Sequence, residues 1–256
     1  MSDNASARDD RPAIQIFSAR ACAEPLRRAA ELYRRRTGAA VEISVCSRHC
    51  ARPAAEEAVG TTGGDDFLLE IADAGIYDLA IGGAEYLLDD GEVRGIVRRG
   101  RRRTIACRRS AIIVPAGNPR AIRSVRDLAA DGVRVGVSVI DCLKGLWEDL
   151  TARLGLLERV RRNIAFHANG CIAIVEAVAE GKVDAAFGWT AFAHLAPGRI
   201  EVVELPADQQ VLRGTSVALL TTARDPEWAE RFMEFLAGPE ARACYLQFGW
   251  VAAVGS

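Results

Sequence analysis

Short apolar segments alternate along the chain with longer segments whose apolar residues recur at helical spacing. In the first pair, 13–17 (AIQIF) predicts a strand, and 24–36 predicts a helix that Gly38 ends as a C-terminal cap. Further strands are predicted at 41–45, 78–81, 111–114, 133–139, 164–166, 183–187, 200–204 and 217–221. Further helices are predicted at 51–59, 124–128, 141–155, 170–181 and from Pro226 onward, with a flexible turn at 60–66. This order favours an α/β fold whose mainly parallel sheets are flanked by helices.

Composition narrows the class of protein. Of the 256 residues, 50% are hydrophobic and 26% are charged, as expected for a globular chain of one large or two medium domains. The net charge is −1, which argues against a protein dedicated to nucleic-acid binding. The segment 94–109 contains eight arginines, and we interpret it as a solvated, ion-paired surface. No segment approaches the roughly 20 continuous apolar residues of a membrane span.

The first residues of the sequence are polar and acidic. Residues 1–11 are predicted to form a disordered leader, and they lack the apolar segment of a secretory signal peptide. The expectation from this segment is a cytoplasmic protein. The alternative is a periplasmic protein whose signal peptide has been removed.

Cysteines gather in the predicted loops that follow strands. In α/β sheets, ligands bind at the carboxyl ends of strands, where helices begin. Four such loops span 17–26, 44–52, 138–146 and 166–174. These loops hold five of the seven cysteines, namely Cys22, Cys46, Cys50, Cys142 and Cys171. We expect the other two, Cys107 and Cys244, to be structural.

Several segments match a known family in their order along the chain. Residues 112–119 (IIVPAGNP) give the most literal match. Segments before and after it also match the family in the same order, namely 16–26, 124–136 and 181–187 (GKVDAAF). By these segments the chain resembles the substrate-binding proteins of molybdate and tungstate ABC transporters, which have the type II periplasmic-binding-protein fold.

The resemblance implies two α/β lobes joined by crossing strands, with the ligand in the cleft between them. Lobe 1 would comprise 12–105 and 210–256, and lobe 2 would comprise 106–209. For an exported protein, the resemblance also implies an ABC permease as the partner. The family typically binds a tetrahedral oxyanion with hydroxyl groups and with backbone amides at helix N-termini, which carry partial positive charge.

The chain departs from the family at those places. Cys22 stands where the first loop of the family often has a ligand serine, and 46–50 (CSRHC) replaces a serine-rich segment. Trp189 replaces the aromatic residue that closes the oxyanion site. The residues expected to line the cleft or to contact an anion are Arg20, Ser47, Arg48, His49, Gly170 and Trp189.

Five cysteines in loops that should face one cleft predict a shared metal centre. Four thiolates suit zinc or an iron–sulfur cluster. Zinc sites usually contain a C-x2-C pair, whereas the nearest pair here, Cys46 and Cys50, is spaced C-x3-C. Ligands from four separate loops favour the larger [4Fe–4S] cluster, with zinc or a bound oxyanion as alternatives. Either Cys46 or Cys50 would be its ligand from the second loop.

The predicted function is therefore a non-catalytic binding protein that holds an iron–sulfur cluster. It would act as a cluster carrier, a sensor or an accessory factor for a metalloenzyme or cluster-assembly partner. The sequence contains no G-x-S-x-G, HExxH or P-loop motif. One alternative is a substrate-binding protein of an ABC transporter for an oxyanion or a soft species such as arsenite or Cu(I). A second alternative is a cluster-dependent enzyme.

Overall fold

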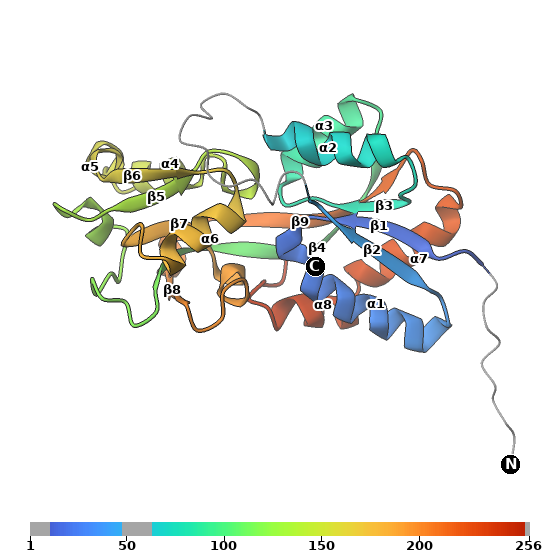
Figure 1. Cartoon of the computed structure of the whole chain (residues 1–256). Helices are drawn as coiled ribbons and strands as arrows, with labels where there is room; N and C mark the ends of the chain where they lie inside the picture. The colour runs from blue at the N-terminus through green and yellow to red at the C-terminus, as the bar shows by residue number, and fades with distance from the viewer. Residues whose placement is uncertain (1–10, 48–62, 254–256) are drawn as a thin grey trace, which may run out of the picture.

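The computed structural model describes residues 11–47 and 63–253, and Figure 1 shows two groups of strands and helices side by side. The strands are β1 (Ile14–Ser18), β2 (Val41–Val45), β3 (Leu79–Ile81), β4 (Val97–Pro115), β5 (Val135–Ser138), β6 (Ile164–Ala168), β7 (Ala185–Trp189), β8 (Ile200–Glu204) and β9 (Leu212–Leu220). The α-helices are α1 (Ala23–Thr37), α2 (Gly63–Ala74), α3 (Glu85–Val93), α4 (Leu146–Ala152), α5 (Leu157–Arg162), α6 (Cys171–Ala179), α7 (Pro226–Ala237) and α8 (Pro239–Leu246). Short 3₁₀ turns are η1 (Arg20–Cys22), η2 (Asp127–Ala129), η3 (Asp141–Leu143), η4 (Thr190–His194) and η5 (Ala207–Gln209).

Within the described residues, the nine strands form one connected sheet in the order β2-β1-β3-β9-β4-β7-β5-β6, with β8 paired to β4. β1 is parallel to β2 and β3, and β5 is parallel to β6 and β7. Every pairing of β4 and β9 is antiparallel. The predicted α/β class is thus confirmed, and the sheet is mixed rather than mainly parallel because these two long strands oppose their neighbours.

The strands β4 and β9 connect the two lobes. β4 pairs with β9 as far as Arg109, and from Ser110 onward it pairs with β7 on one side and β8 on the other. The first part of β4 therefore belongs to the sheet of β1, β2 and β3, and the last part to the sheet of β5, β6 and β7 (Figure 1). The result is the two-lobed arrangement that the family resemblance implies.

Helix α1 shows how apolar spacing becomes packing. Its buried side carries Tyr33, whose ring lies 4.9 Å from that of Phe232 and 5.1 Å from that of Phe235 on α7. The helix ends at Gly38, which has φ of 76° and donates its N–H to the Arg34 carbonyl over 2.8 Å. A left-handed cap of this kind favours glycine, as the sequence predicted.

Two expectations near α2 had different outcomes. The helix predicted at 51–59 lies outside the described residues. The turn predicted at 60–66 is wrong from residue 63 onward, where α2 begins. Paired glycines oppose a helix locally, but Phe67, Leu68 and Ile71 lie at helical spacing and are buried in the core. Tertiary burial thus outweighs the low helix propensity of the first residues.

The arginine-rich segment is also more regular than expected. A strand was predicted at 111–114, whereas β4 begins at Val97 and includes most of that segment. Its early residues pair with β9 through the backbone. This pairing stabilises a strand that the polar side chains of the segment do not predict. Among the described residues, no helix is both long and apolar enough to cross a membrane.

Candidate ligand-binding pocket

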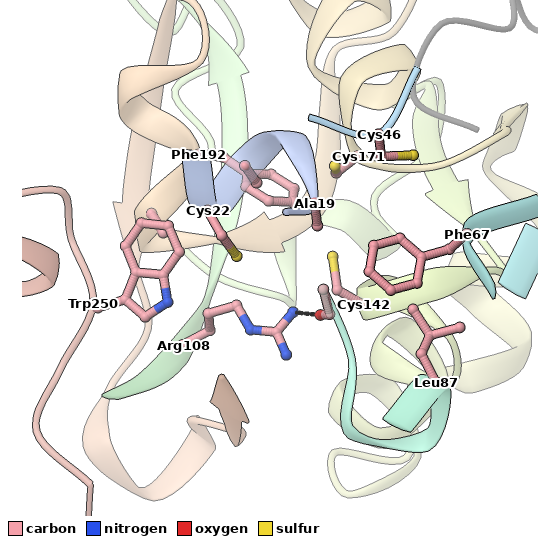
Figure 2. A pocket seen from close by; sticks show the side chains of 13 residues that line it. Ala19, Cys22, Cys46, Phe67, Leu87, Arg108, Cys142, Cys171, Phe192 and Trp250 are labelled. Carbon is pink, nitrogen blue, oxygen red and sulfur yellow. Dashed lines mark hydrogen bonds between the residues drawn. The ribbon is translucent and has the colours of Figure 1, made fainter. Parts of the chain in front are cut away.

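A pocket lies where loops of both lobes meet beside the crossing strands, and Figure 2 shows the side chains around it. Its volume is about 30 Å³. A single water molecule needs about 10–15 Å³ on the same scale, so the pocket has room for roughly two waters. The lining residues are Ala19, Ala21, Cys22, Cys46, Phe67, Gly83, Leu87, Arg108, Cys142, Cys171, Ala191, Phe192 and Trp250.

Lobe 1 contributes two cysteines from adjacent parallel strands. β1 ends at Ser18 and turns through η1, where the Cys22 N–H bonds to the Ala19 carbonyl over 3.0 Å. Cys46 follows β2 directly, and its N–H bonds to the Ser18 carbonyl over 2.9 Å. Both cysteines are buried. Because the carboxyl ends of parallel neighbours meet at one edge of the sheet, the two residues reach the same pocket.

Lobe 2 contributes the other two cysteines from β5 and β6. Cys142 lies in η3, which follows β5, and Cys171 is the first residue of α6, which follows β6. Gly170 precedes α6 with φ of 98°, a conformation that favours glycine, and donates its N–H to Ser138 Oγ over 3.3 Å. The N-terminus of α6 is thereby fixed against the end of β5.

A buried arginine completes the pocket. Arg108 on β4 is only 3% exposed. Its Nη1 donates to the Gly83 carbonyl, its Nη2 donates to the Gly214 carbonyl over 2.8 Å, and its Nε has no hydrogen-bond partner among the described residues. The guanidinium carbon lies 5.0 Å from the ring centroid of Trp189. Figure 2 shows the guanidinium near the sulfur atoms of Cys22 and Cys142.

The electrostatics of Cys22 reflect these neighbours. Burial raises the pKa of the Cys22 thiol from 9.0 to about 12, the positive charge of Arg108 lowers it, and Cys142 raises it. The thiol is therefore protonated at neutral pH in this arrangement. Binding a metal would release its proton, because the thiolate is the form that coordinates.

The pocket does not contain a ready site for a single multiply coordinated ion. Among the described residues, no group of three or more Cys, His, Asp or Glu side chains is placed to hold one metal ion. The four cysteines share a pocket, but among the described residues no three of them are grouped as a zinc tetrahedron requires. Two of them could bridge a two-coordinate ion, and a larger body could reach more of them.

The remaining residues predicted to face the cleft lie in different places. Arg48, His49 and Cys50 lie outside the described residues. Arg20 is exposed, and Ser47 bonds to the carboxylate of Glu70 through its N–H and its hydroxyl, the latter over 2.7 Å. Neither residue lines the pocket described here.

Trp189 is not one of the residues that line the pocket. It is fully buried, and the guanidinium groups of Arg108 and Arg213 lie 5.0 and 5.7 Å from its ring centroid. The aromatic wall comes instead from Phe67, Phe192 and Trp250.

Sequence reasoning missed Arg108, although a signal was present. On a strand, residues two apart share a face, so Arg108 shares one with Ala106, Ser110 and Ile112, all of which are buried. An arginine on that apolar side differs from the others in its segment.

The fold is shared with solved structures. Peb3 from Campylobacter jejuni matches with a TM-score of 0.75 at 19% identity, over 94% of this chain and 100% of that one. The periplasmic molybdate-binding protein of Azotobacter vinelandii matches with a TM-score of 0.70 at 20% identity, over 94% and 99%. The sulfate-binding protein SubI of Mycobacterium tuberculosis matches with a TM-score of 0.76 at 15% identity, over 96% and 88%. At these identities the likeness shows the fold alone.

Sequence comparison identifies the family. No curated protein matches this chain. The family model for bacterial extracellular solute-binding proteins matches residues 14–251, nearly the whole chain. The two-lobed fold, with its pocket between the lobes, agrees with that match. This chain therefore belongs to the family of bacterial extracellular solute-binding proteins.

Proposed function

We propose that this protein is the substrate-binding component of an ABC transporter and that its interlobe pocket takes a thiophilic ligand. The observation that carries the proposal is the placement of four cysteines, two from each lobe, around one pocket. Ligands that bridge both lobes favour the closed form of such a protein, because each lobe supplies part of the binding energy.

The chemistry of the lining supports a soft ligand over a hard oxyanion. Among the described residues that line the pocket, none has a hydroxyl or a carboxylate side chain. Molybdate or sulfate needs several hydrogen-bond donors to replace its water, whereas thiolates prefer soft ions such as Cu(I) and bind As(III). The oxyanion alternative therefore has weaker support from these side chains than the soft-metal alternative.

The expected cellular location changes with the family. The family is described as extracellular. That description favours an exported protein over the cytoplasmic protein expected from residues 1–11. In an exported protein, an ABC permease would be the partner that receives the ligand. Fractionation of the native host with an antibody against this chain would distinguish the two locations.

Ligand-dependent stabilisation tests the proposal. Purified, reduced protein is heated without oxygen in the presence of Cu(I), arsenite or molybdate. At about 100 times the dissociation constant, a bound ligand should raise Tm by roughly 5 °C or more. Cys22→Ser and Cys142→Ser should abolish the shift, whereas Cys244→Ser on α8, which is not a lining residue, should retain it. Stabilisation by molybdate alone, unchanged in the pocket variants, would contradict the thiophilic proposal.

The [4Fe–4S] cluster is a second candidate ligand, favoured by one observation. The described cysteines share a pocket but are not grouped for a single ion, and a cluster with four iron corners reaches thiolates on several sides. Because the pocket has room for only about two waters, the lobes would have to separate to admit the cluster. Cys22, Cys142 and Cys171 would hold it together with either Cys46 or Cys50. When bound, the cluster would supply one-electron redox chemistry. Purification without oxygen, followed by iron and acid-labile sulfide assays, should yield about four of each per chain. A colourless, iron-free protein would reject this candidate.

A further inference from the structure

Two arginines lie directly opposite each other on the crossing strands but differ in their charge partners. Arg108 on β4 pairs in register with Arg213 on β9. Arg213 forms an ion pair with Asp149 over 3.0 Å and donates to the Lys144 carbonyl over 2.6 Å. Arg108 is more deeply buried, and no described carboxylate forms an ion pair with it; its two hydrogen bonds go to the neutral carbonyls of Gly83 and Gly214.

A buried positive charge of this kind is costly. Removal of a cation from water is unfavourable unless a nearby anion or several dipoles replace the lost solvation. The two carbonyls and the face of Trp189 supply part of that replacement. The Nε of Arg108 has no hydrogen-bond partner among the described residues, and Arg108 lies in the pocket wall. A negative charge in the pocket would therefore be stabilised by this guanidinium.

We infer that Arg108 is the counter-cation of the bound ligand and that the pocket selects a ligand whose complex with the cysteine thiolates carries net negative charge. The inference rests on the proposed function and narrows its substrate class. It concerns the charge of the whole thiolate complex rather than the charge of the incoming species.

The soft ligands considered above differ in this property. Cu(I) bound by two thiols forms [Cu(SR)2]⁻ and releases two protons, so the complex carries one negative charge. Arsenite, As(OH)3, bound by two thiols forms As(SR)2(OH) and releases two waters, so the complex is neutral. A [4Fe–4S] cluster with four thiolates is anionic. Arg108 should therefore favour Cu(I) or a cluster and contribute little to arsenite binding.

The test measures Cu(I) and arsenite affinities for matched variants of the full chain. Arg108→Gln removes the charge but can still donate to a carbonyl, and Arg108→Lys keeps the charge. Arg109→Met is the control, because Arg109 is the next residue on β4 and has its own partner, Glu204, at 2.9 Å. Cu(I) affinity is measured without oxygen by competition with a chromogenic chelator, and circular dichroism checks the fold of each variant.

We expect Arg108→Gln to weaken Cu(I) binding by at least about tenfold and to change arsenite binding by less than about threefold. Arg108→Lys should retain most of the Cu(I) affinity, and Arg109→Met should resemble the wild type. Equal weakening of both probes by the Gln and Lys variants, or no weakening by Gln, would overturn the inference. A wild-type protein that binds neither probe would overturn the proposed function instead.

Discussion

The start and the middle of β4 show how position changes the role of one residue type. Near the start of the strand, Arg102 is half-buried and Arg103 is exposed, and they form ion pairs with Asp89 and Glu234 at 2.6 and 2.8 Å. Nearer its middle, Arg108 is buried in the pocket wall with neutral oxygen partners. These two ion-paired arginines agree with the interpretation of the segment as an ion-paired, solvated surface. Arg108 does not fit that interpretation. The hydrogen-bond and ion-pair partners of an arginine, rather than the residue type, therefore indicate whether its charge is available to a ligand.

The largest expected change in stability concerns Trp189, whose ring lies beside the buried Arg108 guanidinium. Trp189→Ala should lower the free energy of unfolding by about 3–5 kcal/mol, because it removes a fully buried indole and the aromatic face near Arg108 and Arg213. Urea denaturation followed by circular dichroism measures the loss. Trp189→Phe keeps an aromatic ring and should lose less. A loss below about 1 kcal/mol for the alanine variant would show that Trp189 contributes little to this region.

A smaller effect should appear as a pH dependence at Cys22. Burial raises the pKa of this thiol to about 12, so the folded state binds its proton more tightly than the unfolded state does. Stability is then lost as pH rises above the unfolded value of about 9, by at most about 1.4 kcal/mol per pH unit. Urea midpoints at pH 8, 9 and 10 should fall more steeply for the wild type than for Cys22→Ala. Parallel pH profiles would contradict the assignment of this dependence to Cys22.

The smallest effect is expected at the exposed start of β4. Arg103→Ala removes a surface ion pair with Glu234, in which both side chains remain about half exposed. Solvent and salt screen such pairs, so the free energy of unfolding should change by less than about 1 kcal/mol. The variant should also bind Cu(I) like the wild type. Weakened ligand binding would contradict the contrast between the start of β4 and Arg108 at its middle.

Much of the fold could be predicted because it depends on local patterns. The strand near 13–17, the helix from 24 to 36 and its Gly38 cap follow from apolar spacing and from the left-handed conformation that glycine favours. The beginning of α2 could not be read in this way, because its stability comes from burying Phe67 and its neighbours against distant segments. The antiparallel pairing of β4 with β9 likewise joins residues about a hundred positions apart.

The candidate site also has features that the sequence predicts and features that it does not. Its sequence positions predict that Cys22, Cys46, Cys142 and Cys171 follow strands, and adjacent parallel strands bring such loops together. The sequence also suggested Trp189 as a cleft residue, whereas in the structure Trp189 is fully buried outside the pocket lining and Trp250 lines the pocket. The iron–sulfur interpretation stays a prediction, since the ligand depends on distances and charges that cysteine spacing does not contain.

The sequence by itself thus determined the order of strands and helices, the α/β class and the concentration of cysteines in loops after strands. These features follow from residue patterns that act over a few positions. Only the tertiary structure decided that β4 and β9 pair antiparallel where the lobes meet, that Trp250 rather than Trp189 lines the pocket, and that Arg108 lies buried beside the cysteines. Burial and charge compensation depend on contacts between segments far apart in the chain, and those contacts distinguish Arg108 from the other arginines around it.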